Sequence, residues 1–495
     1  MAKLKERLSR PLVPTETAGE KYLNWREAIS YALGKGAQGM STSMMNSKYL
    51  NYFLTNMLNL GTSTGGHIRL WCGLWDAIND PLFGVIADKT RTKDGKFRPY
   101  IRWAPYVCAF FTMLFFLSGK LTAGGTAGLI LTIAAFVGWD MSYTAVDIPI
   151  GALAFSITPN SVERTKLFGL SAIVRAVVGA IAGEFVAVAL LFPYFEQNTY
   201  PAYIIAAAVS AAGMVFMTRP TYKHTRERAL YSENTPSLME CLRLLGKNKP
   251  LILLFLANLI YIFATTPAAV SAYMAVDMFG GGKYNLIMDI CTAPAPFVAS
   301  FCVPYIAQKL GAKVDFKRIW VLCCVASAVC YGLMFVICGS SMSRAETPSQ
   351  IPVVISVIFL TLYTLSLIPI ESKNLVQKEM EAETVDFIEW HTGQRAEGIM
   401  ISTMSFTGKL TNSAASSLTL FMLGLAKYQT HADAIYTAQS ADARFALVAL
   451  FTLVPCAALL LMLVPIYFYN ITGEKHRQIA AELAERKAAA ESGEQ

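Results

Sequence analysis

Long apolar segments recur from one end of this chain to the other, and they constrain its fold more than any other feature. Each is about 20 residues long, enough for a helix rising 1.5 Å per residue to cross about 30 Å of hydrocarbon. Only 15% of the residues are charged, against about 25% in soluble globular proteins. We therefore expect an all-α membrane protein with twelve transmembrane helices, centred approximately on residues 42, 76, 109, 140, 180, 209, 263, 295, 328, 362, 410 and 456 of the 495.

The positions of the basic residues predict the orientation of these helices. Lys and Arg gather in the loops after the second, fourth, sixth and eighth segments, whereas the intervening loops carry few of them. Because cytoplasmic loops are enriched in Lys and Arg, both termini are expected in the cytoplasm. The same placement accounts for the net charge of +8 without a nucleic-acid partner. The charged N-terminal region has no apolar core or small-residue cleavage site, so no cleaved signal peptide is expected.

A polar stretch of about 30 residues between the sixth and seventh segments divides the chain into two halves. The expected parts are a cytoplasmic N-terminal segment 1–26, a six-helix half 27–219, a linker 220–250, a second half 251–471 and a charged tail 472–495. Two six-helix halves with a long cytoplasmic linker are typical of major facilitator transporters, which bind substrate near the membrane midplane between the halves. The Ala-rich tail is expected to be solvated and to serve solubility and orientation.

A channel or a membrane-bound enzyme is the alternative to a transporter. The sequence contains no TVGYG pore signature and no HExxH, GxSxG or Walker motif, so neither alternative is favoured. We therefore do not expect an enzyme.

Two carboxylates lie inside the second apolar segment. Asp76 and Asp80 are four residues apart and share one helix face with Asn79 beside them, and no nearby Lys or Arg neutralises them. An ionisable group at that depth is costly enough to indicate function. Such a set of oxygen ligands suits a hard monovalent cation or a shuttled proton. Two acids on a solvated surface are the alternative, and the apolar residues around them argue against it.

The fourth segment carries a second polar stripe. Asp140, Thr144, Asp147 and Gly151 recur at helical spacing, which places two carboxylates, a hydroxyl and a bare patch of backbone on one face. We expect this face to line a cavity, so that its oxygens and those of the second segment converge on one ion. Sodium and protons both suit such ligands, and the sequence does not choose between them.

Basic residues inside the later segments suggest how an anionic group is addressed. Lys409 lies about 12 residues into its segment, too deep to reach the interface easily, so it needs an acidic partner or an anionic substrate. A permanent ion pair with Asp147 or Asp140 is the alternative. Arg175 is the second candidate. The predicted substrate-binding residues are Asp140, Asp147, Gly151, Arg175, Asn374 and Lys409. For Asp140 we favour pairing with Arg175 or Lys409 over a proton site or an entry ligand for Na⁺.

Three motifs together match a known family. The run from Asp76 to Tyr100, the DIPIGAL stretch from Asp147, and the run from Glu381 to Gly398 resemble the glycoside–pentoside–hexuronide:cation symporters, the melibiose permease family. The resemblance covers essentially the whole membrane part. It implies a major facilitator fold and cation-coupled uptake of a glycoside across a bacterial inner membrane.

The resemblance also implies roles for individual residues. Lys409 matches the family's functional lysine in the eleventh helix. The cation site corresponds to Asp76, Asn79, Asp80, Thr144 and Asp147. A cytoplasmic gating and stabilising network corresponds to Asp88, Arg91, Gly95, Arg98, Pro99, Glu163 and Arg164.

The sugar site departs from the melibiose permease pattern. That protein has a Trp where this chain has Gly151, and its first-helix Asp falls near Gly39 or Met40 here, while Arg175 is displaced by about one turn. These departures favour an anionic glycoside, as carried by glucuronide and sulfoquinovose transporters, or an oligosaccharide. The expected partners are this small-molecule glycoside and membrane lipid. The protein is expected to be a monomer and to need no cofactor beyond Na⁺ or H⁺ as the coupling ion. A carrier of a non-sugar amphiphile such as a lipid, and a non-transporting sensor, are the alternatives.

Overall fold

The computed structural model describes residues 23–45, 48–90, 92–122, 125–158, 161–192, 194–195, 198–228, 248–310, 315–392, 397–430 and 438–493. The chain divides into two compact units, Met1–Glu233 with Thr430–Ile435, and Asn234–Gln429 with Tyr436–Gln495. We call them the N-terminal and C-terminal units. The residue boundaries predicted for the tails, halves and linker remain predictions.

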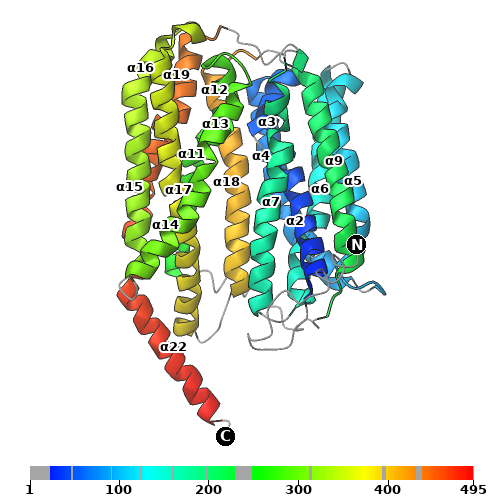
Figure 1. The fold of residues 1–495 in the computed structure, drawn as a ribbon, viewed down its shortest axis with the longest axis vertical. Helices are drawn as coiled ribbons and strands as arrows, with labels where there is room; N and C mark the ends of the chain where they lie inside the picture. Colours follow the sequence, from blue (N-terminus) through cyan, green and yellow to red (C-terminus); the bar gives the residue numbers. More distant parts are fainter. Residues whose placement is uncertain are drawn as a thin grey trace. The chain divides into compact units, whose positions relative to one another are not determined.

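Helices make up the N-terminal unit (Figure 1). Its long helix α6 holds the predicted polar stripe of the fourth segment. The elements in chain order are α2 (Trp25–Met45), α3 (Lys48–Tyr52), the π-helix η1 (Phe53–Met57), α4 (Thr62–Lys89), α5 (Arg98–Leu121), α6 (Gly125–Ile157), α7 (Ser161–Ala189) and α9 (Thr199–His224).

The C-terminal unit is helical too, and several of its helices are interrupted at prolines. Its elements are α11 (Lys249–Ala264), α12 (Thr266–Asp277), α13 (Tyr284–Thr292), α14 (Pro294–Leu310), α15 (Phe316–Met334), the π-helix η3 (Phe335–Gly339), α16 (Ser340–Arg344), the 3-10 helix η4 (Pro348–Gln350), α17 (Val353–Thr392), α18 (Glu397–Leu425), α19 (Ala441–Phe451), α20 (Leu453–Leu461), α21 (Leu463–Tyr467) and α22 (Gly473–Gly493). Breaks occur next to Pro267, Pro294 and Pro465, because proline cannot donate the backbone hydrogen bond that continues a helix.

The centre of every predicted apolar segment falls in a described helix. Nine spans among the described residues are long and apolar enough to cross a membrane. The segments outside those nine are α2, α4 and α18, which carry Lys35, the acids of the second segment, and Lys409.

Small residues set how closely helices approach in the N-terminal unit. Helix α2 packs against α7 and α9, α5 packs against α6 and α9, and α4 lies against α6. A Cβ built on Gly39 of α2 would lie 2.5 Å from the carbonyl oxygen of Arg175 in α7, and one built on Gly179 would lie 3.2 Å from the Gly39 carbonyl. Close approach of this kind is what small residues in membrane helices permit. A Cβ on Gly183 would likewise lie 3.2 Å from the Ser43 Cβ of α2, so both glycines of α7 serve the α2–α7 contact.

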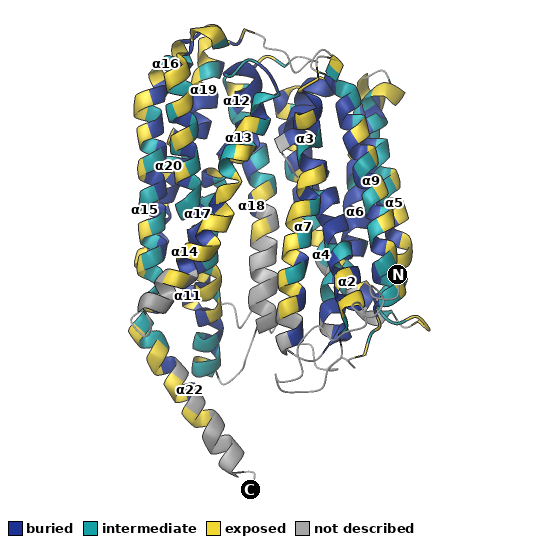
Figure 2. Cartoon of the chain, viewed as in Figure 1, coloured by how far each residue is buried: buried dark blue, intermediate teal, exposed yellow. Residues whose placement is uncertain are grey.

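Exposed and buried residues alternate along these helices (Figure 2). Large apolar side chains such as Trp71, Phe110 and Phe216 are exposed on α4, α5 and α9. In a helix that spans a membrane, an exposed apolar face of this kind meets lipid. The buried face of the N-terminal unit is aromatic, with the Phe53 ring of η1 centred 4.7 Å from Phe116 and 5.1 Å from Tyr203.

The C-terminal helix α22 packs against the end of α17, which differs from the solvated tail expected from the sequence. Ile479 and Leu483 of α22 are buried, and Trp390 of α17 donates a 2.6 Å hydrogen bond to Glu482. Nε2 of His476 on α22 lies 3.1 Å from Oδ2 of Asp386 on α17. Apolar residues four positions apart give this otherwise charged helix one apolar stripe, and that stripe is buried.

Candidate functional site

A chain of hydrogen bonds joins α4 to α6 at the predicted cation site. Nδ2 of Asn79 donates to the Thr144 hydroxyl at 3.0 Å, and that hydroxyl donates to Oδ1 of Asp80 at 3.0 Å. Thr144 is fully buried, Asn79 is buried and Asp80 is half-buried. The two stripes recognised in the sequence therefore face each other within one unit. Their side-chain oxygens belong to the class of ligands that bind hard cations.

Asp76 and Asp147, the other two acids of the predicted cation site, both lie near Tyr143. Tyr143, one residue before Thr144 on α6, lies within electrostatic range of Asp147 and Asp76. Asp76 and Asp147 are both half-buried. These acids therefore occupy the same two helices as the hydrogen-bonded chain, and both lie within range of one residue of α6. That the five predicted residues form one cation site stays a prediction.

A lysine that was not singled out from the sequence belongs to the same region. Lys35 of α2 lies within electrostatic range of Asp147 of α6 and Arg175 of α7. Arg175 is exposed, and it is also within range of Tyr143. The signal was present, because an ionisable residue inside an apolar segment indicates function by default. In the sequence, however, Lys35 lies among Gly and Ser residues, which indicate close helix packing rather than a binding site.

Asp140 is buried near α4. It lies within electrostatic range of Cys72, and Cys72 is also within range of Arg69. Arg69 is buried, and its Nη1 donates a 3.4 Å hydrogen bond to the Met45 carbonyl oxygen. Arg69 is two turns before Asp76 on the same helix, so a cation is present on this stripe that was not considered from the sequence. The predicted pairing of Asp140 with Arg175 or Lys409 stays a prediction.

The position of Gly151 leaves room beside α6. No described heavy atom lies within 4 Å of where a Cβ at Gly151 would stand. This agrees with the expectation that Gly at this position makes space for a bulky group. The side chain of Lys409, on α18, lies outside the described residues.

The C-terminal unit contains a half-buried polar cluster around α17. Nε2 of Gln377 donates to Asn258 of α11 at 3.0 Å and to Glu381 at 3.0 Å. Asn374, predicted as a substrate residue, is a hydrogen-bond neighbour of Tyr261. The structure thus places Asn374 among hydrogen-bonding side chains of α11 and α17, rather than against lipid.

Lys373 is the second intramembrane lysine that was not singled out from the sequence. It is buried, and its Nζ lies 3.6 Å from the centre of the Tyr261 ring and 5.8 Å from that of Trp320. Within the described residues, no carboxylate oxygen lies within 4.0 Å of its Nζ. A desolvated ammonium over an aromatic face is stabilised by the ring quadrupole, by about 2 kcal/mol or more.

The predicted cytoplasmic network is built around a residue that the sequence did not reveal. The carboxylate of Glu227, beyond the end of α9, accepts hydrogen bonds from the backbone N–H groups of Lys96, Phe97 and Arg98 at 2.9, 2.9 and 3.1 Å. It therefore neutralises the positive end of α5. Gly95 has φ +112°, and a Cβ there would lie 2.6 Å from the Glu227 carboxylate. The predicted Pro99 occupies the first turn of α5.

Arg98 ties this helix start to α9. Its Nη2 donates to the Tyr222 carbonyl oxygen at 2.9 Å and its Nη1 to the Asp94 carbonyl oxygen at 3.2 Å. The loop before α5 and the end of α9 are therefore joined by side-chain and backbone contacts in both directions.

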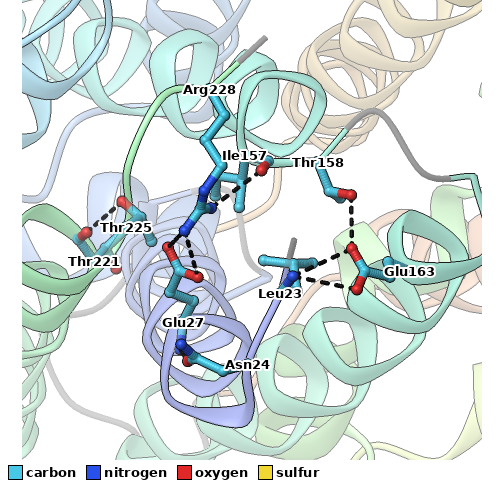
Figure 3. Close-up of polar contacts among 9 residues, drawn as sticks. All are labelled: Leu23, Asn24, Glu27, Ile157, Thr158, Glu163, Thr221, Thr225 and Arg228. Atoms are coloured by element: carbon cyan, nitrogen blue, oxygen red, sulfur yellow. Dashed lines mark hydrogen bonds and ion pairs between the residues drawn. The ribbon is translucent and has the colours of Figure 1, made fainter. Parts of the chain in front are cut away.

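A second set of contacts joins α2, α6 and α7 at the same end of the unit (Figure 3). The carboxylate of Glu163, a predicted network residue, accepts from the Leu23 N–H at 3.2 Å and from the Thr158 hydroxyl at 2.8 Å. Arg228 donates from Nη2 to both carboxylate oxygens of Glu27 at 2.8 and 2.9 Å, and from Nη1 to the Ile157 carbonyl oxygen at 3.2 Å.

Glu163 links the segment before α2 to the end of α6, which gives it a structural role in the predicted network. Glu27 and Arg228 were not predicted from the sequence. The Leu23–Glu163 and Glu27–Arg228 contacts join residues 140 and 201 positions apart, and a local sequence pattern cannot reveal such pairs. The side chains of the other predicted network residues lie outside the described part of the chain: Asp88, Arg91 and Arg164.

Apolar helices with carboxylates, amides and hydroxyls converging inside one unit define a multi-pass membrane protein that handles ions or small polar solutes. A family model described as MFS/sugar transport protein matches residues 30–473. The chain belongs to this family. It is a secondary membrane transporter, not an enzyme, as predicted from the sequence.

Similar proteins agree with the predicted group of glycoside–pentoside–hexuronide:cation symporters. The chain is 28% identical to the uncharacterized symporter YjmB of Bacillus subtilis over 98% of this chain and 100% of that protein. It is 25% identical to a glucuronide carrier protein homolog of Escherichia coli over 94% of this chain and 96% of that protein. An isoprimeverose transporter of Lactiplantibacillus pentosus is 26% identical over 94% of this chain and 93% of that protein. With bacterial relatives of this kind, the protein is placed in a bacterial inner membrane.

Solved structures support the fold. A bacterial homolog of the human lysosomal transporter Spinster, in an inward-facing conformation, has a TM-score of 0.65 at 11% identity and covers 92% of this chain and 97% of its own. A peptide transporter in complex with sulfate has a TM-score of 0.59 at 12% identity and covers 94% of this chain and 97% of its own. The predicted major facilitator fold is confirmed.

Proposed function

We propose that this transporter imports a glycoside together with Na⁺ or H⁺, and that the glycoside is an anionic, uronide-type sugar or an oligosaccharide. The observation that carries the coupling is the hydrogen-bonded chain from Asn79 through Thr144 to Asp80, with Asp76 and Asp147 on the same two helices. Side-chain oxygens from two helices, partly buried inside one unit, form a set that suits a hard cation or a proton.

In this proposal, cation binding prepares the protein for sugar. A cation at Asp76, Asp80 and Asp147 neutralises carboxylates inside the membrane, which lowers the cost of keeping them there. The neutralised site then favours sugar binding, and the loaded protein changes from an outward-open to an inward-open state. Because linkage is reciprocal, sugar must tighten cation binding by the same factor.

Charge supports an anionic sugar. Lys35 lies within electrostatic range of both Arg175 and Asp147. Guanidinium and ammonium groups form the stronger, charge-assisted hydrogen bonds with carboxylates. The space beside Gly151 supports a bulky substrate. The names glucuronide carrier homolog and isoprimeverose transporter, given to two relatives, point in the same direction.

Counterflow in proteoliposomes tests the proposal. Proteoliposomes that contain the purified protein are loaded with unlabelled glucuronide, neutral glucoside or disaccharide, and exchange for the labelled compound is followed. Accumulation of the labelled compound in unloaded proteoliposomes is then measured with a Na⁺ gradient, a proton gradient or neither. We expect exchange of at least one glycoside and accumulation only with one gradient. Asp80→Asn should abolish accumulation and leave exchange measurable, whereas the exposed Asp442→Asn serves as the matched control and should behave as wild type.

Other outcomes identify the alternatives. Binding of a glycoside without flux indicates a sensor, and flux of an amphiphile with no response to sugars indicates a lipid carrier. Normal accumulation in the Asp80 variant would remove the cation site from the proposal.

A further inference from the structure

A cleft of about 320 Å³ lies between the cytoplasmic ends of α5 and α9, away from the candidate cation site. It is rimmed by basic and aromatic side chains from both helices: Arg102, Trp103, Tyr106, Arg219, Tyr222 and Lys223. The cytoplasmic end is identified by the basic loop before α5 and by the contacts of Arg98 and Glu227, which join that loop to the end of α9.

The rim of this cleft carries more positive than negative charge. Arg219 and Lys223 are exposed, and neither makes a hydrogen bond or an ion pair with the described part of the chain. The Arg102 guanidinium lies over the rings of Trp103 at 5.0 Å and Tyr222 at 5.5 Å, and 3.8 Å from the Asp94 carboxylate. Three cations and one acid therefore leave a net positive charge at the rim.

The exposed side chains around the cleft are of the types expected where lipid headgroups meet acyl chains. Trp103 is 63% exposed and Tyr106 is 43% exposed, and Trp and Tyr are enriched at membrane interfaces. Further toward the membrane centre, Phe110 of α5 is 60% exposed and Phe216 of α9 is 66% exposed. A polar, cationic mouth above an apolar wall matches a molecule with an anionic head and hydrocarbon tails.

We propose that this cleft binds an anionic phospholipid of the inner leaflet, with its phosphate at Arg102, Arg219 and Lys223 and its acyl chains along the exposed faces of α5 and α9. Basic pockets between membrane helices on the cytoplasmic side are known to take anionic headgroups. A soluble phosphate would meet the same cations, but it would gain nothing from the exposed aromatic and apolar wall.

Lipid bound in the cleft would stabilise the contact between the start of α5 and the end of α9. The Tyr222 ring lies beneath both the Arg98 and Arg102 guanidinium groups, at 5.1 and 5.5 Å, and Arg98 holds the Tyr222 backbone. A phosphate at Arg102 therefore acts on residues that already fasten the start of α5 to the end of α9. Bound lipid stabilises the folded protein in proportion to its concentration relative to its dissociation constant.

Thermal unfolding of the full-length protein in a neutral detergent tests this site. Phosphatidylglycerol and phosphatidylcholine with identical acyl chains are titrated separately, and the unfolding temperature is followed. Phosphatidylglycerol should raise it in a saturable way, and phosphatidylcholine should raise it less. Glycerol phosphate, which has the same headgroup chemistry without chains, should have no effect at the same concentrations.

Variants assign the effect to the cleft. The double variant Arg219→Gln, Lys223→Gln should bind phosphatidylglycerol about 30-fold more weakly, from about fivefold for each cation near the membrane surface. Lys120→Gln is the matched control, because Lys120 lies at the other end of α5 with its Nζ 5.2 Å from the Tyr200 ring. The Lys120→Gln variant should bind phosphatidylglycerol with the same affinity as wild type. If the double variant does not fold, Lys223→Gln alone should show the fivefold loss.

Three results would overturn the proposal. Equal stabilisation by both lipids in wild type would remove the role of charge. An unchanged affinity in the folded variants would place the anionic lipid elsewhere. Stabilisation by glycerol phosphate equal to that by phosphatidylglycerol would identify a site for soluble anions instead.

Discussion

The Thr144 hydroxyl of α6 donates a 3.0 Å hydrogen bond to Oδ1 of Asp80 on α4. The same hydroxyl accepts from Asn79, so its single proton is committed to the carboxylate. This hydrogen bond orients the Asp80 carboxylate at the candidate cation site. Thr144 therefore acts on the candidate ion through Asp80 as well as by its own oxygen.

Replacing Thr144 with Val should weaken cation binding. The change keeps the side-chain shape but leaves the Asn79 amide and the Asp80 carboxylate without this partner, at a cost of about 1–3 kcal/mol of unfolding free energy for a buried group left unsatisfied. The stabilisation of the protein by Na⁺ in thermal unfolding, or the pH dependence of uptake if H⁺ is the coupling ion, should shift to higher ion concentration.

Thr132→Val is the control for that variant. Thr132 is also buried on α6, and its hydroxyl donates a 2.9 Å hydrogen bond to Ser118 of α5. It should lose similar stability while its ion dependence stays that of wild type. An identical ion response in Thr144→Val and Thr132→Val would show that Thr144 has only a structural role.

The candidate cation site was accessible from the sequence because helical periodicity fixes which side chains share a face. Asp76 and Asp80 on one helix, and Thr144 and Asp147 on the next but one, needed only the 3.6-residue repeat and the family resemblance. The pairing of Asn79 with Thr144, and of Thr144 with Asp80, needed the structure, because a repeat within one helix says nothing about its rotation relative to another.

Residues whose partners lie far along the chain were not predictable. Glu227 is about 130 residues from the backbone that it caps, and Glu27 is 201 residues from Arg228. Lys35 and Lys373 were visible as charges inside apolar helices, yet their neighbours on other helices decide whether they are structural or functional. The docking of α22 depends on Ile479 and Leu483, whose short apolar stripe is diluted by the charges around it.

Lys35 should contribute to recognition of an anionic sugar. Lys35→Gln removes a cation near Asp147 and Arg175. If it addresses the substrate carboxylate, the affinity for a uronide should fall roughly 10- to 150-fold, from about 1.5–3 kcal/mol for a charge-assisted hydrogen bond. Competition by a neutral glycoside should change little. Equal losses for the acidic and neutral sugars would argue that Lys35 only balances Asp147, and Lys120→Gln again provides the control.

Gly95→Ala should destabilise the N-terminal unit through two separable effects. The residue has φ +112°, which L side chains rarely adopt, and a Cβ would collide with the Glu227 carboxylate at 2.6 Å. Gly125 has φ +71° with no described atom within 4 Å of a Cβ, and Gly61 has neither feature. We expect the largest fall in unfolding temperature for Gly95→Ala, a smaller one for Gly125→Ala, and only the small loss of an N-cap glycine for Gly61→Ala.

Combining Gly95→Ala with Glu227→Gln tests the contact itself. If the collision displaces the cap of α5, the two changes act on one interaction and their effects on unfolding free energy should not add. Strict additivity would show that Gly95 is required for backbone conformation alone.

The packing of α22 on α17 should protect the C-terminal end from proteolysis. Ile479→Asp places a charge on the buried stripe and should release α22, so that trypsin cleaves after Arg477 and Arg486 several times faster. Ala481→Asp adds the same charge on an exposed position and should leave the cleavage rate unchanged. Equal rates in wild type and Ile479→Asp would mean that α22 is accessible in both.

Asp140 is buried beside α4, which makes Arg69 of α4 a further candidate partner for its carboxylate. Both residues lie near Cys72, and removing one member of a buried ion pair typically costs about 3–5 kcal/mol. Asp140→Asn should therefore impair transport and lower the unfolding temperature. If Arg69 is the partner, adding Arg69→Met should recover part of the loss, whereas Arg175→Gln or Lys409→Gln should not.

The same set of double variants separates the other roles of Asp140. Recovery with Arg175→Gln or Lys409→Gln would support the pairing predicted from the sequence, and a shifted pH optimum without any recovery would identify a proton site. Because a carboxylate at this depth is stable in its charged form only beside a cation or a bound ion, each role leaves a different signature in uptake measured across pH. Wild-type uptake by Asp140→Asn at every pH would contradict all of them.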